Sequence, residues 1–190
     1  MMPNWPKKNY LIIILLLIIV TGVVEWWMGR IPFCKCGIIS WWSGDIWSNQ
    51  NSQQFADPYT FTHILHGTIF YFLLWLAFGK KFSPWARLVL AVLIEGGWEV
   101  FENSDFIINR YREATISLDY YGDSIFNSLA DILAMVLGFI LTWKWSVKAV
   151  VIGSIVLDLF LLWWIKDSLA VNIIMLIYPI EAVKNWQLGK

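Results

Sequence analysis

The stretch DSIFNSLADILAMVLGFILTW, residues 123–143, combines the two properties that decide the fold class. Residues 124–143 are long and apolar enough for one membrane-spanning helix, which needs about 20 mostly apolar residues. Asp123, Asn127 and Asp131 are spaced at i, i+4 and i+8, which places them on one face of that helix. Ionisable groups are costly in lipid and normally face a bundle interior or a cavity. The stretch therefore predicts a membrane helix whose polar face lines a site.

Five further apolar runs predict an all-α, multi-pass transmembrane helix bundle that forms a single integral membrane domain, residues 1–190. Hydrophobic residues make up 58% of the chain and charged residues only 15%, against about a quarter charged in soluble domains. The last run is short and contains Asn172 and Pro179, so we expect six spans, with five as the alternative. The predicted spans are residues 9–27, 61–79, 86–104, 124–143, 147–166 and 168–182.

The basic residues predict the orientation of these spans. With six spans and a cytoplasmic N-terminus, nine of the 14 basic residues lie on the inner side, which favours two cytoplasmic termini by the positive-inside rule. The first run lacks a small-residue cleavage site, so we expect it to stay as a span. The long connections 28–60 and 105–123 then lie outside. The inner residues are Lys7, Lys8, Lys80, Lys81, Arg87, Lys144, Lys148, Lys184 and Lys190; the outer ones are Arg30, Lys35, Arg110, Arg112 and Lys166.

The overall charge and the motif content restrict the function. Lys plus Arg equals Asp plus Glu, 14 each, so no basic excess points to nucleic acid, and membrane lipids are the expected partners. The 14 tryptophans suit a chain with two membrane–water interfaces. A glycine-rich phosphate loop, a Gly-x-Ser-x-Gly elbow and a His-Glu-x-x-His helix are all absent from the sequence, so the common soluble enzyme classes gain no support.

Two other predicted helices carry polar residues on one face. His63 and His66 are at i and i+3, and Glu95, Glu99 and Glu102 are at i, i+4 and i+7. In the predicted topology all three sets lie toward the outer helix ends, with His66, Asp131 and Glu95 roughly 8, 10 and 13 Å deep at 1.5 Å per residue. The sequence therefore predicts one polar pocket that opens outward beneath the two long connections.

Several chemistries fit this pocket, and the sequence leaves open whether the protein is an enzyme. Histidines and carboxylates can ligate a divalent metal such as zinc or iron, or can transfer protons in hydrolysis. The leading hypothesis is a site for an envelope lipid or an anionic head group, with Arg110 and Arg112 as anion-binding guanidinium forks. Glu99, His63 and Asp123 are the main candidates for proton transfer or ligation. The other expected contacts of a substrate are Glu102, Asn127, Asp131 and Tyr120.

Two other hypotheses stand beside this one. A metal-handling protein would use Cys34, Cys36, His63 and His66. A disulfide between cysteines only two positions apart closes a small strained ring, and thiolate binding of a soft metal such as Cu(I) is the sharper alternative. In the third hypothesis the intramembrane polar groups only hydrogen-bond across helices and hold a structural or assembly protein together.

Five motifs resemble the signature of an uncharacterised family of bacterial inner-membrane proteins, domain-of-unknown-function family 2585. The resemblance covers nearly the whole chain and implies a multi-pass location in the bacterial inner membrane, without an established activity. The helix at residues 123–131, which follows an acidic helix, also resembles the VanZ-like membrane proteins, more distantly. The motifs are CKCG (34–37), YTFTHILHG (59–67), EGGWEVFEN (95–103), TISLDYYGDSIFNSLAD (115–131) and NIIMLIYP (172–179).

Overall fold

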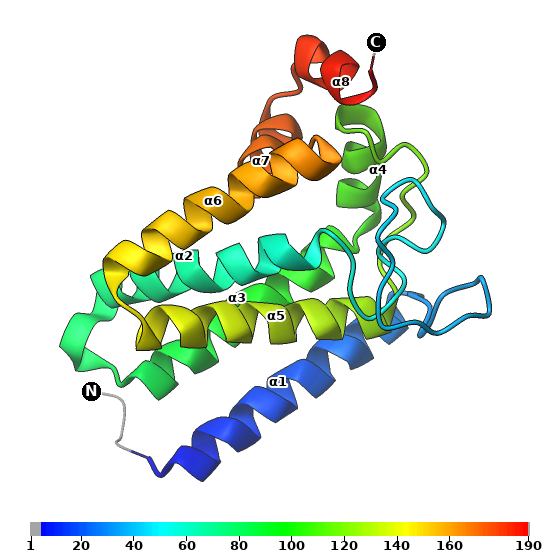
Figure 1. Ribbon diagram of the computed structural model, residues 1–190. Helices are drawn as coiled ribbons and strands as arrows, with labels where there is room; N and C mark the ends of the chain where they lie inside the picture. The colour runs from blue at the N-terminus through cyan, green and yellow to red at the C-terminus, as the bar shows by residue number, and fades with distance from the viewer. Residues whose placement is uncertain (1–4, 190) are drawn as a thin grey trace.

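The computed structural model describes residues 5–189 and confirms the all-α prediction (Figure 1). Over these residues the chain forms eight α-helices and a short 3₁₀ turn, Gly79–Lys81, and no strand. The helices are α1 (Lys7–Trp27), α2 (Thr60–Phe78), α3 (Pro84–Glu102), α4 (Asp105–Ala114), α5 (Ile125–Lys144), α6 (Val147–Ile165), α7 (Leu169–Ile177) and α8 (Glu181–Gln187).

Four helices are long and apolar enough to cross a membrane, judged by length and composition: α1, α2 with its 3₁₀ turn, α5 and α6. Two of them, α1 and α6, bury little of their surface within the bundle. Their outer faces expose large apolar side chains such as Leu15 and Val20 on α1 and Ile155 and Trp163 on α6. Continuous apolar surface of this kind marks contact with a membrane or a partner.

The structure does not support six spans. The run predicted as the sixth span, residues 168–182, is broken into α7 and α8. The break is at Tyr178, whose backbone is extended (φ −137°, ψ 93°), because the proline that follows disfavours helical geometry in the preceding residue. With nine residues, α7 is about 14 Å long, half of a hydrocarbon core of about 30 Å.

Helix α3 matches a predicted span in position but differs from the four apolar helices in composition. Its 19 residues include Arg87, Glu95, Glu99 and Glu102, and its buried face packs against α1, α2 and α5. Figure 1 shows α3 running alongside α2 and α5. Glu95 and Glu99 of the acidic helix therefore face the bundle interior, where the neighbouring helices bury them, while Ile94 and Phe101 lie on its exposed face.

Serine side chains cap the N-termini of five helices. The Ser124 hydroxyl accepts a hydrogen bond from the backbone N–H of Asn127, and Ser83, Ser104, Ser146 and Ser168 cap α3, α4, α6 and α7 in the same way. Each cap satisfies a backbone donor that the first helical turn leaves free. These caps fix where the connections end, and the Ser124 cap holds the polar first turns of α5 at the mouth of the bundle.

Helices α2 and α5 cross with their backbones in contact. A Cβ atom added at Gly67 would lie 2.0 Å from the Met135 carbonyl oxygen, and one added at Gly138 would lie 2.0 Å from the Ile64 carbonyl oxygen. Small residues at a helix crossing permit this approach in membrane bundles. The crossing lies beside His63 and therefore sets how close the polar faces of the two helices come.

The bundle interior has two halves of opposite character. The apolar half is built around Leu74, Leu88, Ile132, Met135 and Phe139, all less than a tenth exposed. The polar half begins one turn further along the same helices. It consists of the buried residues Glu25, His63, Glu95, Glu99, Asn103, Asp123, Asn127 and Asp131.

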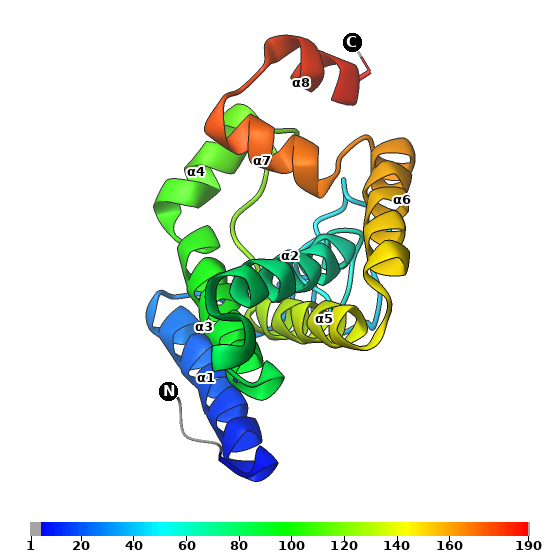
Figure 2. The same cartoon turned by 90° about the vertical axis from the view of Figure 1, so that its left-hand side faces the viewer.

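The C-terminal helices lie at the end of the bundle that carries the two long connections (Figures 1 and 2). The Lys184 ammonium donates to the Glu113 carbonyl, and Gln187 Nε2 donates to the Lys166 carbonyl at 2.9 Å. Figure 1 places the start of α1 at the opposite end. The prediction that both termini lie on one side depended on the sixth span, and this arrangement does not support it.

Candidate functional site

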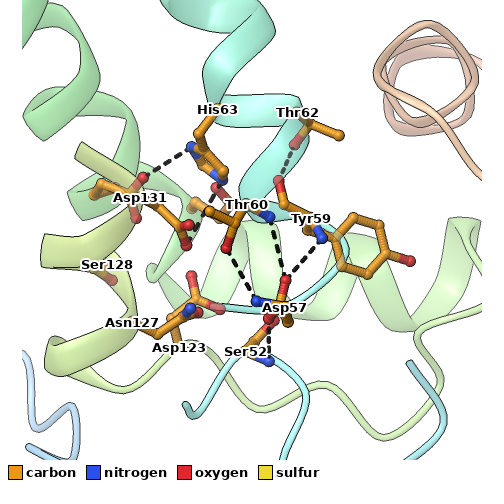
Figure 3. Close-up of polar contacts among 12 residues, drawn as sticks. Ser52, Asp57, Tyr59, Thr60, Thr62, His63, Asp123, Asn127, Ser128 and Asp131 are labelled. Atoms are coloured by element: carbon orange, nitrogen blue, oxygen red, sulfur yellow. Dashed lines mark hydrogen bonds and ion pairs between the residues drawn. The ribbon is translucent and has the colours of Figure 1, made fainter. Parts of the chain in front are cut away.

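A cavity of about 590 Å³ lies along the N-terminal half of α2, between α3, α5 and α7. Figure 3 shows His63 on α2 and Asp131 on α5 facing each other, with Asp57, Asp123 and Asn127 gathered beside them. The lining also has a large apolar part. It is formed by Ile69, Phe70, Ile94, Phe101, Ile173 and Leu176.

One glutamate holds both histidines of α2. Glu95 Oε1 lies 2.7 Å from His63 Nδ1 and 3.1 Å from His66 Nδ1. The i, i+3 spacing on α2 turns both rings toward α3, and Glu95 meets them from a fully buried position. His63 Nε2 also lies 3.9 Å from Asp131 Oδ2. The histidine pair therefore joins α2, α3 and α5, as the sequence predicted for these three faces.

Glu99 lies one helical turn beyond Glu95 and is equally buried. Its Oε1 atom lies 3.4 Å from His63 Nδ1. Neither carboxylate oxygen has a hydrogen-bond partner within the described part of the chain. A buried carboxylate without partners costs free energy, so Glu99 contributes little to the stability of the bundle in this arrangement.

Asn103 connects the end of α3 to the start of α5. Its Nδ2 donates to Ser128 Oγ (3.2 Å) and to Asp123 Oδ2 (3.4 Å), and its Oδ1 accepts from the backbone N–H of Asp123 (2.7 Å). The Tyr120 hydroxyl donates to the other oxygen of Asp123 at 3.0 Å. Burial, and then the nearby Glu102 carboxylate, hold the pKa of Asp123 well above its usual range.

Two tyrosines tie the cavity to the C-terminal segment. The Tyr111 hydroxyl donates to Glu102 Oε1 at 2.7 Å and lies 3.2 Å from Asn172 Oδ1 of α7. The Tyr59 hydroxyl donates to Asp167 Oδ2 at 3.2 Å. Burial raises the pKa of Asp167 to about 6. These contacts make α4 and α7 one side of the cavity.

Sequence reasoning missed three buried polar residues, of which one lines the cavity and two lie in the polar half outside its lining. Glu25 is fully buried in α1 and interacts electrostatically with Glu102 and Asp131. Asp57 caps the turn before α2 by accepting the backbone N–H groups of Ser52 (2.8 Å) and Tyr59 (2.7 Å), and it lines the cavity. Asn103 is the third. The signal for Glu25 was its i, i+4 spacing from Thr21, since both are buried on the same face of α1.

The two predicted anion-binding arginines lie outside the cavity lining. Arg110 Nε donates to the Leu176 carbonyl at 2.7 Å and its Nη2 donates to the Ile177 carbonyl at 3.2 Å. Arg112 Nε donates to the Tyr120 carbonyl. Both guanidinium groups thus hold backbone segments together here, and their anion-binding role stays a prediction.

The two cysteines are joined to each other and not to the histidines. Cys34 and Cys36 form a disulfide, with their Cα atoms 5.2 Å apart. A disulfide sulfur is not a thiolate and is therefore a poor ligand for a soft metal. Among the described residues, the groups with metal-ligand spacing contain histidines and glutamates only. The geometry therefore does not support a single metal site formed by Cys34, Cys36, His63 and His66.

The remaining predicted residues do come together. His63, His66, Glu102, Tyr120, Asp123, Asn127 and Asp131 line the cavity, and Glu99 lies behind His63. Their roles in catalysis or substrate binding stay predictions.

Comparison with known proteins places the chain in a family. The model of a protein family of unknown function, DUF2585, matches residues 25–189. A UPF0314 protein of Paracoccus denitrificans (strain Pd 1222) is 50% identical over 164 residues, which are 85% of this chain and 83% of the relative. A UPF0314 protein of Rhizobium meliloti (strain 1021) is 48% identical over 168 residues, 88% of this chain and 84% of the relative.

No solved structure matches the chain, and the comparisons do not show the more distant resemblance to VanZ-like proteins. The family match begins at the buried Glu25 and includes every cavity residue described above. The motif-based resemblance is therefore confirmed: this chain belongs to the DUF2585 family of proteins of unknown function.

Proposed function

We propose that the protein is a multi-pass protein of the bacterial inner membrane whose cavity takes up an envelope lipid. The carrying observation is the mixed lining of the cavity. Most of the lining is apolar, through residues such as Ile94 and Phe70, and it also presents the polar His63, Asp123 and Asp131. A site with a mostly apolar lining and a few convergent polar groups suits an amphipathic ligand.

In this proposal the lipid chain lies against α2, α3 and α7, and the polar head lies against the start of α5. Ile94 is 45% exposed on the surface of α3 while it also lines the cavity, so the apolar lining continues into the surface that would face lipid. A lipid can therefore enter sideways from the bilayer. The head group would meet carboxylates, which favours hydroxyl or amine groups over an unshielded phosphate.

The proposed topology has five crossings, made by α1, α2, α3, α5 and α6. The Cys34–Cys36 disulfide supports a periplasmic position for loop 28–60, because disulfides persist in the periplasm and are rare in the cytoplasm. Lys80, in the 3₁₀ turn after α2, and Lys144, the last residue of α5, lie at the other end, as the positive-inside rule expects. The C-terminus is then periplasmic. A periplasm-specific reporter fused after the last residue should be active; activity of a cytoplasmic reporter there contradicts this topology.

The lipid proposal is tested with a matched pair of substitutions on α3. Ile94→Trp fills the apolar part of the lining, whereas Leu93→Trp adds the same side chain at an equally exposed position that does not line the cavity. Each protein is purified in mild detergent, and its retained lipids are quantified by native mass spectrometry. We expect Ile94→Trp to lose bound lipid while Leu93→Trp retains it. Equal lipid retention by both variants contradicts the proposal.

A further inference from the structure

The polar half contains more buried carboxylate groups than there are positively charged side chains beside them, among the described residues. Glu95 and Glu99 are fully buried and Asp131 nearly so. Among the described residues, the ion pair that involves an arginine or lysine is Arg30 with Asp105, outside this cluster. Buried charges are normally paired or coordinate a metal. The two histidines are the nearest partners of the carboxylates, and they are too few to neutralise them.

The orphaned oxygens of Glu99 point to a ligand that is not part of the protein. The side chain is fully buried, both oxygens lack a hydrogen-bond partner among the described residues, and Oε1 is directed at His63. Glu102 Oε2 also lacks a hydrogen-bond partner there. Placing ionised oxygens of this kind in a bundle interior is unfavourable, and a bound cation or a proton relieves it.

The arrangement of the candidate ligand atoms fits one ion. One ligand atom each from His63, His66 and Glu95 lie within 4.8 Å of one another, and so do those from His63, Glu99 and Glu102. Ligand atoms about 2.0 to 2.2 Å from a common ion lie at most about 4.4 Å apart, a separation that these groups reach with small side-chain movements. Both groups share His63, so Glu99 lies beside the first position and can complete its coordination shell.

We infer that His63, His66 and Glu95, with Glu99 beside them, form a site for a divalent transition-metal ion. Two imidazoles and carboxylates are the ligand set of zinc and iron, whereas calcium and magnesium prefer oxygen ligands alone. The site lies on the polar floor of the cavity, since both histidines line it. It does not depend on lipid uptake, and the two proposals can fail separately.

The test compares two buried glutamates of the same bundle. Glu95→Gln removes a proposed ligand, whereas Glu25→Gln changes a fully buried glutamate of α1 that is outside both ligand groups. Each protein is purified with a chelator, incubated with Zn²⁺ or Co²⁺ and desalted. Metal is quantified by mass spectrometry, and the visible absorption of Co²⁺ reports nitrogen and oxygen coordination. Size-exclusion profiles and thermal unfolding with chelator show whether each variant is folded.

We expect near-stoichiometric metal in the wild type and in Glu25→Gln, and at least about tenfold weaker retention in Glu95→Gln. If Glu95→Gln is not folded, His66→Gln replaces it, because His66 is partly exposed at the cavity and less integral to the core. Wild-type protein that holds no metal above the desalting blank overturns the inference. Equal loss in Glu25→Gln and Glu95→Gln also overturns it, because the effect would then follow from general disturbance of the bundle.

Discussion

The two halves of the bundle are built from the same helices but satisfy their buried atoms in different ways. Around Met135 and Phe139 the buried cluster is apolar, and the buried Arg87 at its edge stacks its guanidinium over the Tyr71 ring. One turn further along the helices, around Glu95 and Glu99, carboxylates are buried, and several of their oxygens lack hydrogen-bond partners. Departures from the rule that buried polar atoms are paired occur mainly at functional sites. We propose that the apolar half stabilises the fold and that the polar half binds ligands.

The largest effect is expected where the two halves meet. Gly138→Ala would place a Cβ atom 2.0 Å from the Ile64 carbonyl oxygen, so α2 and α5 must separate along their length. We expect a loss of more than about 4 kcal/mol, a size that is exceptional for one substitution. Gly153→Ala in α6 is the control, because an added Cβ has no neighbour within 4 Å there. Thermal unfolding in detergent distinguishes them, and equal melting temperatures would refute the close crossing.

The next effect separates stability from ligand binding. Phe139→Ala removes a fully buried ring from the apolar half and should cost about 3 to 4 kcal/mol. Because the ring does not line the cavity, the folded fraction should retain lipid and metal as the wild type does. Unfolding curves and native mass spectra of the same sample test both points. Loss of bound ligand from folded Phe139→Ala would break the division between the halves.

A smaller effect concerns pH and the C-terminal segment. Burial raises the pKa of Asp167 from 3.8 to about 6, so the folded protein holds this proton more tightly than the unfolded chain. The stability contribution is therefore fully present below about pH 4 and is lost as the pH rises through about 6. The difference corresponds to about 3 kcal/mol at most.

Asp167→Asn removes this titration, and its stability curve between pH 4 and pH 8 should lack the fall that the wild type shows. The exposed Asp119→Asn variant serves as the control. Chemical unfolding at each pH measures the difference. Parallel curves for the wild type and Asp167→Asn would show that Asp167 does not titrate in this range.

Much of the fold was predictable because helix periodicity and apolar length are local properties. The spacing of His63 and His66, and of Glu95 and Glu99, predicted faces that the structure brings together. The prediction of a sixth span was wrong because it gave more weight to the apolar composition of the segment than to Pro179. That proline ends α7 through a local effect on the residue before it.

The rest of the site depends on contacts that no local pattern encodes. Asn103 reaches Asp123 and Ser128 only after α3 and α5 have packed. Glu25 follows an apolar run and precedes two tryptophans, which is the pattern of an interfacial residue, yet the packing of α1 on α3 and α5 buries it completely. The sequence could not show that Arg110 and Arg112 bind backbone carbonyls. The partner of Arg110 is far away in the sequence, and the partner of Arg112 lies in an irregular loop.

The most direct test of the division between the two halves is the thermal stability of Glu99→Leu, measured with chelator present. If the carboxylate of Glu99 serves a ligand, its replacement by an apolar side chain of similar size removes an uncompensated buried charge. The melting temperature should then equal or exceed that of the wild type, while metal retention falls. If the carboxylate instead holds the bundle together, Glu99→Leu will melt well below the wild type, as is expected of Phe139→Ala. That result would contradict the account of a stable apolar half and a ligand-binding polar half.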